Sequence, residues 1–390
     1  MKKIAIVTTT RAEYGLLSPV VRELREKENQ EFRAELIVSG THLSKEYGMT
    51  VDEIKASETR IDHQIMIPVN SASELDISNN QAETLVKFSK LFDTERYDAV
   101  ILLGDRYETL AIAIAAGNTR TPIFHLCGGD TTEGALDEWI RHSITKISYL
   151  HFVTNEESRK RVIQLGEVPD RVFNYGSTSI DNILTVANMS KQEALESIEL
   201  NDCRYALCTY HPVTMEGGNI EKQIDSFLET IKQFPELQFF VTKSNADQGG
   251  AKINEMLDCA EKSIDNLHVY TSLGVRRYLS LMRYAEFVLG NSSSGIIETP
   301  AFHIPTVNIG DRQRGRLQSA SIVNCTDDTT AIVEAIRIAL SESHKALCKE
   351  VVSPYGDGHA AKRIAAKSYE TVVAKIIDLK KQFYNMEKDL

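Results

Sequence analysis

The sequence predicts an α/β protein with two parallel β-sheets, each covered by helices on both faces. Short runs of β-branched and other apolar residues alternate with longer stretches of helical spacing. The short runs are almost continuously apolar, which is typical of parallel strands that are buried on both faces. The alternation pauses near Asn201 and then starts again, and a chain of 390 residues is long enough for two domains.

The first half of the chain contains five predicted strands with helical stretches between them. The strands are 3–8, 34–39, 99–103, 123–126 and 150–154, and the helical stretches include 16–27, 82–92 and 107–116. We place the first domain at residues 1–180.

The second half repeats the pattern and predicts a second sheet. Its strands are 205–210, 237–242, 267–270, 287–289 and 306–309, and its helices include 220–233 and 274–284. A helical stretch over 181–197 leads into the polar Leu200-Asn201-Asp202, so the second domain is placed at 181–358. The amphipathic stretch 359–383 predicts a long last helix, in a C-terminal segment 359–390 that packs back on the first domain.

Composition and charge exclude several classes of protein. The formal net charge of −11 comes from acids spread along the chain, without the basic stripe that neutralises nucleic-acid phosphates. No apolar stretch approaches the roughly 20 residues that span a bilayer, and the apolar run near the N-terminus leads to no cleavage-type segment. We therefore expect a cytoplasmic protein that binds neither nucleic acid nor membrane.

Cysteine and histidine spacing predicts no metal centre and no disulfide framework. The six cysteines form no CxxC pair, so reduced thiols are expected. The ten histidines show no HExxH or similar ligand spacing. We predict no metal and no cofactor.

Polar clusters follow several predicted strands, where parallel sheets bind their ligands. After the first strand comes a polar turn with Arg11, which either contacts an anionic ligand at a helix N-terminus or pairs with Glu13 on the surface. The turn lacks GxGxxG, so no dinucleotide fingerprint is present. Asp105 follows the strand 99–103 and is either a helix cap or an acid/base carboxylate.

A third cluster follows the strand 123–126. Gly128 and Gly129 allow close backbone approach to a ligand, and Asp130 comes next. In the helix 137–146, i,i+4 spacing places Asp137 opposite Arg141 and Glu138 opposite His142, which a solvated helix face also explains. Asp105, Asp130 and Asp137 are nevertheless an excess of carboxylates at one sheet edge, and crowded carboxylates raise one another's pKa values.

The second half offers candidates for binding a nucleotide diphosphate. His211 ends a strand and is either structural or able to contact a phosphate leaving group. The segment 290–298, GNSSSGIIE, puts hydroxyls and backbone N–H groups at a predicted helix N-terminus, with Glu298 placed to bind a ribose diol. The alternative is a serine N-cap with an ordinary first-turn glutamate. Arg312, Arg314 and Arg316 suit a diphosphate.

In this order the clusters resemble the hydrolysing UDP-N-acetylglucosamine 2-epimerases of sialic acid biosynthesis, over essentially the whole chain. The matching segments are TRAEYG (10–15), GDRYE (104–108), GGD (128–130), DEWIRHSITK (137–146), HPVT (211–214), GNSSSGIIE (290–298) and GDRQRGR (310–316). The resemblance implies a GT-B architecture, in which two Rossmann-like domains face a cleft that holds the active site. It also implies a homo-dimer or homo-tetramer.

The resemblance implies elimination of UDP across C1 and C2, followed by addition of water to the 2-acetamidoglucal. It assigns proton transfer to Asp105, Asp130 and Asp137, departure of UDP to His211, the diphosphate to Arg11, Ser293, Ser294 and Arg312, and the ribose to Glu298. Further candidate substrate-binding residues are Arg106, Glu138, Arg141, His142, Ser292 and Gly295. Several relatives have Glu, which has the longer side chain, where Asp130 stands.

Two substrates and two other kinds of enzyme remain open. The segments 129–135 and 271–274 are at least as similar to the branch that acts on UDP-2,4-diacetamido-2,4,6-trideoxyglucose for legionaminic acid as to the branch that acts on UDP-N-acetylglucosamine. A GT-B glycosyltransferase or a non-hydrolysing epimerase would share the fold and the nucleotide site. Clustered carboxylates in the first half favour elimination chemistry.

Overall fold

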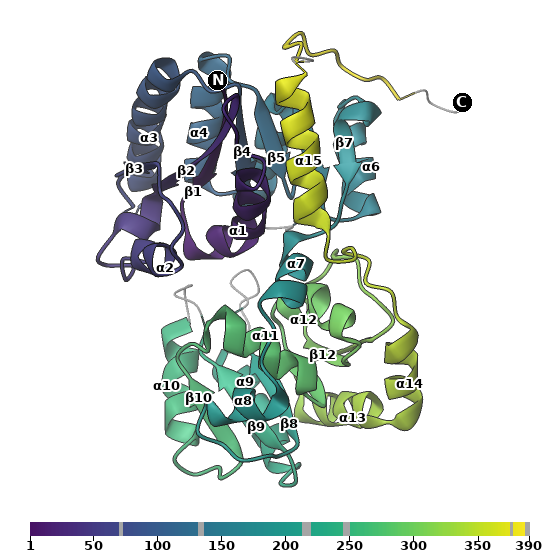
Figure 1. The fold of residues 1–390 in the computed structure, drawn as a ribbon. Helices are drawn as coiled ribbons and strands as arrows, with labels where there is room; N and C mark the ends of the chain where they lie inside the picture. Colours follow the sequence, from purple (N-terminus) through teal and green to yellow (C-terminus); the bar gives the residue numbers. More distant parts are fainter. Residues whose placement is uncertain (70–72, 132–135, 213–219, 245–249, 375–376, 387–390) are drawn as a thin grey trace. The chain divides into compact units, whose positions relative to one another are not determined.

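The computed structural model describes residues 1–69, 73–131, 136–212, 220–244, 250–374 and 377–386. The described chain divides into two compact units, unit 1 of Met1–Asp181 with Gly358–Leu390 and unit 2 of Asn182–Asp357. Each unit contains one sheet, and its described strand pairs are parallel. The predicted α/β class with two parallel sheets is therefore confirmed (Figure 1).

The sheet of unit 1 has the order β3-β2-β1-β4-β5-β6-β7. Its strands are β1 Lys2–Thr8, β2 Phe32–Ser39, β3 His63–Ile65, β4 Ala99–Leu103, β5 Ile123–Leu126, β6 Leu150–Val153 and β7 Val172–Asn174. The chain adds strands on one side of β1 and then, from β4 on, on the other side. The topological switch point of unit 1 thus lies between β1 and β4.

Alternate residues of β1 belong to two separate cores. Ile4 and Ile6 pack on one face, whereas Ala5 and Val7 pack on the other. The helices with residues in the first core are α1 Arg11–Arg25, α2 Val51–Ala56 and α15 Ala360–Val373, and those in the second are α3 Glu74–Glu95, α4 Tyr107–Asn118 and α5 Leu136–Ile147. Figure 1 shows α15 (yellow) beside α1, with which it is in contact.

Unit 2 has a sheet of the same kind, in the order β10-β9-β8-β11-β12-β13. Its strands are β8 Tyr205–Thr209, β9 Gln238–Thr242, β10 Leu267–Tyr270, β11 Phe287–Gly290, β12 Thr306–Ile309 and β13 Ile322–Cys325. Its switch point lies between β8 and β11.

The faces of the second sheet also alternate. Ala206 and Cys208 pack with α9 Ile220–Lys232, α10 Gly250–Ala260 and α13 Thr329–Leu340. Tyr205 and Leu207 pack with α8 Lys191–Glu196 and α11 Gly274–Tyr284. The remaining helices are α6 Glu156–Gln164, α7 Thr178–Thr185, α12 Ser294–Ile297 and α14 Glu342–Glu350. No described helix has the length and apolar character that crossing a membrane requires.

The predicted helix over 181–197 is wrong, because two helices occupy this stretch. α7 ends at Thr185, and α8 starts at Lys191 after its own N-cap, Ser190. The Ser190 hydroxyl accepts from the Glu193 N–H, and the Glu193 carboxylate accepts from the Ser190 N–H. This capping box starts a second helix where the hydrophobic pattern indicated a continuous one.

The predicted long C-terminal helix is also too long. α15 ends at Val373, and residues 377–386 are not helical. Lys381 donates to the carbonyls of Lys146 and Ser148 at 2.7 and 2.8 Å and pairs with the Glu167 carboxylate at 2.6 Å. The Tyr384 N–H donates to the Gly166 carbonyl at 2.9 Å. The tail therefore exchanges helical hydrogen bonds for contacts with unit 1.

The sequence pattern missed β3, β7 and β13, each of which lies at the edge of its sheet. They contain three or four residues and are only partly buried. Short strands of this kind lack the apolar run on which the prediction depended.

Candidate functional site

The candidate residues of both units lie beyond the carboxyl ends of the strands, in loops or in the helices that follow them. In unit 1, Arg11 is the first residue of α1, just after the loop that follows β1, and Asp105 lies in the loop after β4. In unit 2, His211 lies in the loop after β8, and residues 290–295, here called the serine segment, run from the end of β11 into α12. Because parallel sheets bind ligands beyond the carboxyl ends of the strands at the switch point, each unit presents one candidate binding region.

Asp105 does not cap α4. The N-cap residue is Arg106, and it makes no side-chain capping bond. The Asp105 carboxylate instead accepts a hydrogen bond from the Arg141 guanidinium and forms an ion pair with it. The cap interpretation is therefore wrong, since α4 begins one residue too late for Asp105 to cap it.

Arg141 connects the segments that follow β4 and β5 with α5. Its side chain is 3% exposed, and besides Asp105 it contacts the Glu138 carboxylate at 3.0 Å and the Asp130 carbonyl at 2.8 Å. Burial opposes the charge of Arg141, but Asp105 and the neighbouring acids raise its pKa above the ordinary value. Glu138 also contacts His142 at 3.1 Å, as the i,i+4 spacing predicts.

Asp130 is held by hydroxyl groups. Its Oδ1 accepts from Thr154 at 2.9 Å and from Ser158 at 2.6 Å. Gly129 has φ +81°, and a Cβ there would overlap the Ser158 carbonyl. The close approach that the glycine pair permits is thus to α6, and the two hydroxyls stabilise and orient the Asp130 carboxylate.

Asp137 shows the effect expected of crowded carboxylates. Desolvation raises its pKa, the charge of Asp105 raises it further, and Arg141 and Arg106 oppose the shift. A carboxyl group with a raised pKa can donate a proton at a pH where an ordinary aspartate cannot. Asp105 and Asp137 therefore have the electrostatic coupling of an acid and base pair.

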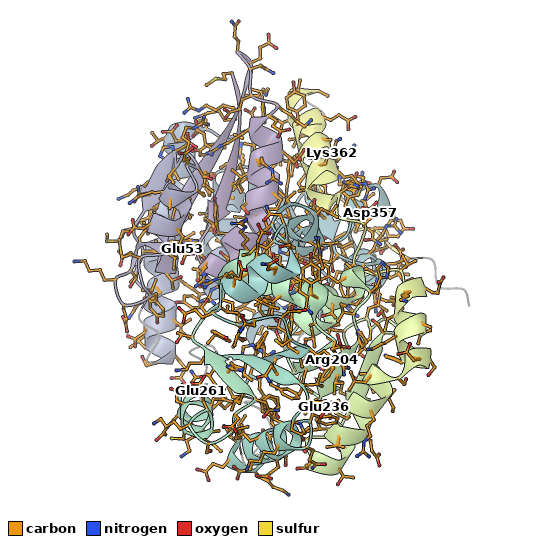
Figure 2. All side chains as sticks on the ribbon, turned by 60° about the horizontal axis from the view of Figure 1, so that its bottom comes forward. Glu53, Arg204, Glu236, Glu261, Asp357 and Lys362 are labelled. Atoms are coloured by element: carbon orange, nitrogen blue, oxygen red, sulfur yellow. The ribbon has the colours of Figure 1, made fainter. Side chains whose placement is uncertain are left out.

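Glu13 is a buried capping residue, although the sequence suggested only a surface partner for Arg11. Its carboxylate accepts from the N–H groups of Thr9 and Thr10 at 2.7 and 3.2 Å, in a capping box that the Thr10-x-x-Glu13 spacing already encodes. Arg11 pairs with Glu53 of α2, 3.5 Å away, and Figure 2 labels Glu53. The alternative of a surface pair between Arg11 and Glu13 is wrong, because Glu13 is buried.

In unit 2, Asn291 connects the candidate loops. The His211 N–H donates to Asn291 Oδ1 at 2.7 Å, and Asn291 Nδ2 donates to the His211 carbonyl at 2.8 Å. Arg312 and Gln313 donate to the Asn291 carbonyl at 3.1 and 2.8 Å. The His211 ring lies 3.3 Å from the Ser244 hydroxyl. No sequence pattern indicated that Asn291 joins three segments.

The serine segment begins with a backbone turn that requires glycine. Gly290 has φ +136°, and a Cβ there would overlap the Thr209 carbonyl of β8. α12, which follows, is only four residues long, and its N-cap Ser293 makes no side-chain capping bond. The alternative of an ordinary serine cap is therefore wrong.

The other serines and Gly295 are held within unit 2. Ser292 accepts from the Ser294 N–H at 3.4 Å, and the Ser294 hydroxyl lies 2.7 Å from the Tyr278 hydroxyl. The buried Gly295 accepts from the Thr306 hydroxyl at 2.8 Å.

Glu298 is not in the first turn of a helix, because α12 ends at Ile297 and Glu298 is its C-cap. Desolvation raises the pKa of Glu298 to about 7, and a hydrogen bond with Ser294 opposes the shift. A desolvated carboxylate beside the serine segment suits a ligand that supplies hydroxyl donors.

A hollow of 880 Å³ lies at the carboxyl ends of β12 and β13. Arg314 and Arg316 line this hollow together with Asp311, which forms a 4.0 Å ion pair with Arg314. Arg312 contacts Asn291 instead. The three arginines that the sequence grouped together therefore have different surroundings.

Among the described residues, one cluster has donor atoms close enough for a metal ion. Glu35, His63 and Glu95 each offer a ligand atom within 4.8 Å of the others. Lys3 pairs with Glu95 at 2.8 Å, and Arg33 pairs with Glu35 at 3.5 Å. The cluster's charge is thus already balanced by cationic side chains.

Part of one matching segment, and part of the substrate-branch segment, lie outside the described residues. These parts are residues 213–214 of HPVT and residues 132–135 of the segment 129–135.

Two parallel sheets with Rossmann strand order and polar loops at both switch points define a class of nucleotide-binding α/β proteins. A family model described as UDP-N-acetylglucosamine 2-epimerase matches residues 23–367. The chain therefore belongs to the UDP-N-acetylglucosamine 2-epimerase family, and it is a UDP-sugar 2-epimerase.

Individual relatives cover most of the chain. It is 39% identical over 325 residues to a GDP/UDP-N,N'-diacetylbacillosamine 2-epimerase (hydrolyzing) of Campylobacter jejuni, covering 83% of this chain and 84% of the relative. It is 38% identical over 358 residues to the polysialic acid biosynthesis protein P7 of Escherichia coli, covering 91% and 90%. A crystal structure of UDP-GlcNAc 2-epimerase from Neisseria meningitidis bound to UDP-GlcNAc has a TM-score of 0.81 at 20% identity, covering 95% and 100%.

Proposed function

We propose that the chain is a hydrolysing UDP-N-acetylglucosamine 2-epimerase. It converts UDP-N-acetylglucosamine and water to N-acetylmannosamine and UDP through a 2-acetamidoglucal. The observation that carries the proposal is the coupling of Asp105, Arg141 and Asp137 beyond β4 and β5 of unit 1, where desolvation and the charge of Asp105 raise the pKa of Asp137. Inversion at C2 needs one group that removes a proton and one that returns it, and this cluster offers both.

The reaction has two steps. In the first, a carboxylate removes the C2 proton, the C1–O bond to UDP breaks, and UDP leaves with the bonding pair as the C1–C2 double bond forms. In the second, a protonated carboxyl returns a proton to the opposite face of C2, and water adds its oxygen to C1 and releases its proton. Asp105, Asp130 and Asp137 are the proposed proton-transfer groups, and Arg141 orients Asp105.

The nucleotide is assigned to unit 2 together with Arg11. His211 assists departure of UDP, Ser293, Ser294, Arg11 and Arg312 bind the diphosphate, and Glu298 accepts from the ribose hydroxyls. The serine segment and the desolvated Glu298 support this assignment. Guanidinium and hydroxyl groups can neutralise and solvate a diphosphate without a metal ion.

Product analysis tests the proposal. Incubation with UDP-N-acetylglucosamine is expected to release UDP and free N-acetylmannosamine in equal amounts. Formation of UDP-N-acetylmannosamine as the final product would indicate a non-hydrolysing epimerase instead.

A second candidate substrate is UDP-2,4-diacetamido-2,4,6-trideoxyglucose. The Campylobacter jejuni relative favours it, because N,N'-diacetylbacillosamine is 2,4-diacetamido-2,4,6-trideoxyglucose. Comparison of kcat/KM for the two UDP-sugars decides between them. A ratio of at least about tenfold toward the diacetamido sugar, equivalent to about 1.4 kcal/mol, would assign it as the substrate.

A further inference from the structure

Two buried glutamates face the switch point of unit 1, and the reaction proposed above does not use either. Glu13 belongs to α1 and is 6% exposed, and Glu108 belongs to α4 and is 2% exposed. The Thr9 hydroxyl lies between them, 2.8 Å from Glu13 Oε2 and 3.4 Å from Glu108 Oε1. The two carboxyl groups therefore approach the same hydroxyl from different helices.

One oxygen of each carboxyl group is well supplied with donors and the other is not. Glu13 Oε2 accepts from Thr9 and Thr10, and Glu108 Oε1 accepts from Arg106 Nε at 2.7 Å. Glu13 Oε1 and Glu108 Oε2 are buried without a hydrogen-bond partner. A buried carboxylate oxygen without a donor is costly, and a hydroxyl carries only one proton to donate.

The balance of charge around the two carboxyl groups also favours a bound proton. Arg106 supplies one positive charge, whereas two ionised glutamates would leave a buried excess of one negative charge. One proton bound to either of the two orphaned oxygens removes the excess negative charge. We propose that Glu13 and Glu108 share one proton between Glu13 Oε1 and Glu108 Oε2, and that this pair positions Arg106 beside the Asp105 and Asp137 cluster.

The other titratable groups near the two glutamates do not supply a positive charge, so Arg106 is the group that neutralises one of the carboxylates. His42 of the neighbouring 3-10 helix contacts the Thr8 hydroxyl at 3.0 Å, and burial lowers its pKa to about 4, so it is neutral at physiological pH. Burial and the charge of Glu108 raise the pKa of Tyr107. Burial and the charge of Glu108 likewise raise the pKa of Glu13 to about 7.

The pair can influence the proposed reaction through Asp137. The positive charge of Arg106 lowers the pKa of Asp137, and the negative charge of Glu108 raises it. Loss of the shared proton would add a negative charge on this side of the sheet and favour the protonated form of Asp137. Glu13 and Glu108 are therefore positioning residues, and this consequence rests on the proposed function.

Carbon-13 NMR of protein labelled at the glutamate carboxyl carbon tests the shared proton directly. From about pH 5 to about pH 9, the wild-type resonances of Glu13 and Glu108 are expected to move together as one proton is lost. In Glu13→Gln the amide replaces the shared proton as donor, so the Glu108 resonance stays at its ionised position throughout. Glu35, in β2 of the same unit, is also buried, so Glu35→Gln is the matched control and leaves the paired transition in place.

Two results would overturn the proposal. One is that both wild-type carboxyl groups are already ionised at about pH 5, and the other is that Glu108 still titrates near neutrality in Glu13→Gln. If the Gln variant does not fold, the wild-type titration and the Glu108→Gln variant decide the question, because Glu13 must then also lose its transition near neutrality.

The pH profile of turnover tests the positioning role. Glu13→Gln is expected to remove the change in kcat that accompanies loss of the proton, with KM within about twofold of wild type, while Glu35→Gln keeps the wild-type profile. An unaltered profile in Glu13→Gln contradicts the positioning role. Absence of UDP release by the wild-type chain would defeat the proposed function, whereas the NMR titration would still decide whether the proton is shared.

Discussion

Replacing Glu298 with Gln should make the free protein more stable above neutral pH and weaken its binding of UDP. Desolvation raises the pKa of Glu298 from 4.5 to about 7, so the folded state holds the proton more tightly than the unfolded state. The free energy of unfolding therefore falls as pH rises from about 4.5 to about 7, and the full shift corresponds to about 3 kcal/mol. Partial exposure of Glu298 reduces the expected difference to about 1–2 kcal/mol.

Urea unfolding at a series of pH values measures this effect. Glu298→Gln cannot ionise, so its stability should exceed that of wild type by about 1–2 kcal/mol at about pH 8 and match it at about pH 4. The exposed Glu236 of the same unit, labelled in Figure 2, provides the control variant Glu236→Gln, which should follow the wild-type curve.

Calorimetric titration with UDP completes the test. If Glu298 accepts from the ribose diol, loss of charge-assisted hydrogen bonds worth about 1.5–3 kcal/mol should raise Kd roughly tenfold to a hundredfold at about pH 8. If Glu298→Gln gains stability and loses affinity for UDP, the Glu298 carboxylate of the wild type contributes to UDP binding. Unchanged UDP affinity, together with the wild-type dependence of stability on pH, would refute the reasoning.

Three further predictions follow from the two units. Asp105→Asn should lower kcat, measured by UDP release, at least about 100-fold and leave UDP affinity, measured by calorimetry, within about twofold. Near-normal turnover would remove Asp105 from the proton-transfer groups. Chelation with EDTA should leave turnover unchanged, because guanidinium groups are assigned to the diphosphate, and loss of activity that Mg²⁺ restores would contradict this assignment. Lys381→Met should destabilise unit 1 by about 1–3 kcal/mol, because Lys381 helps to hold the pKa of the buried Glu167 at about 2. Urea unfolding measures this loss, and an unchanged midpoint would contradict the role of the tail.

The buried strands were the easiest part of the fold to predict. All five strands predicted in each half agree within two residues at both ends with observed strands, because a run that is apolar on both faces gives a strong local signal. The edge strand β13 and the end of α15 gave no such signal. The tail beyond Val373 is amphipathic enough for a helix, yet residues 377–386 are not helical, and Lys381 and Phe383 contact other residues of unit 1.

The candidate site was predictable in its residue types and less so in its connections. Spacing placed Asp105 at a strand end, but only the fold shows that Arg141, 36 residues later, pairs with it. Glu13 could have been found from its capping-box spacing, whereas its approach to Glu108 depends on β1 and β4 being neighbours in the sheet. Asn291 gave no signal, because its side chain bonds to backbone groups 80 residues away.

The most direct test of the proposed function is the reaction of UDP-N-acetylglucosamine in D₂O, followed by proton NMR. Elimination and addition predict free N-acetylmannosamine with deuterium at C2, formed in step with UDP, because the C2 proton is removed and a solvent-derived one is returned to the opposite face. Retention of the original hydrogen at C2, or a product that keeps its UDP, would contradict the account.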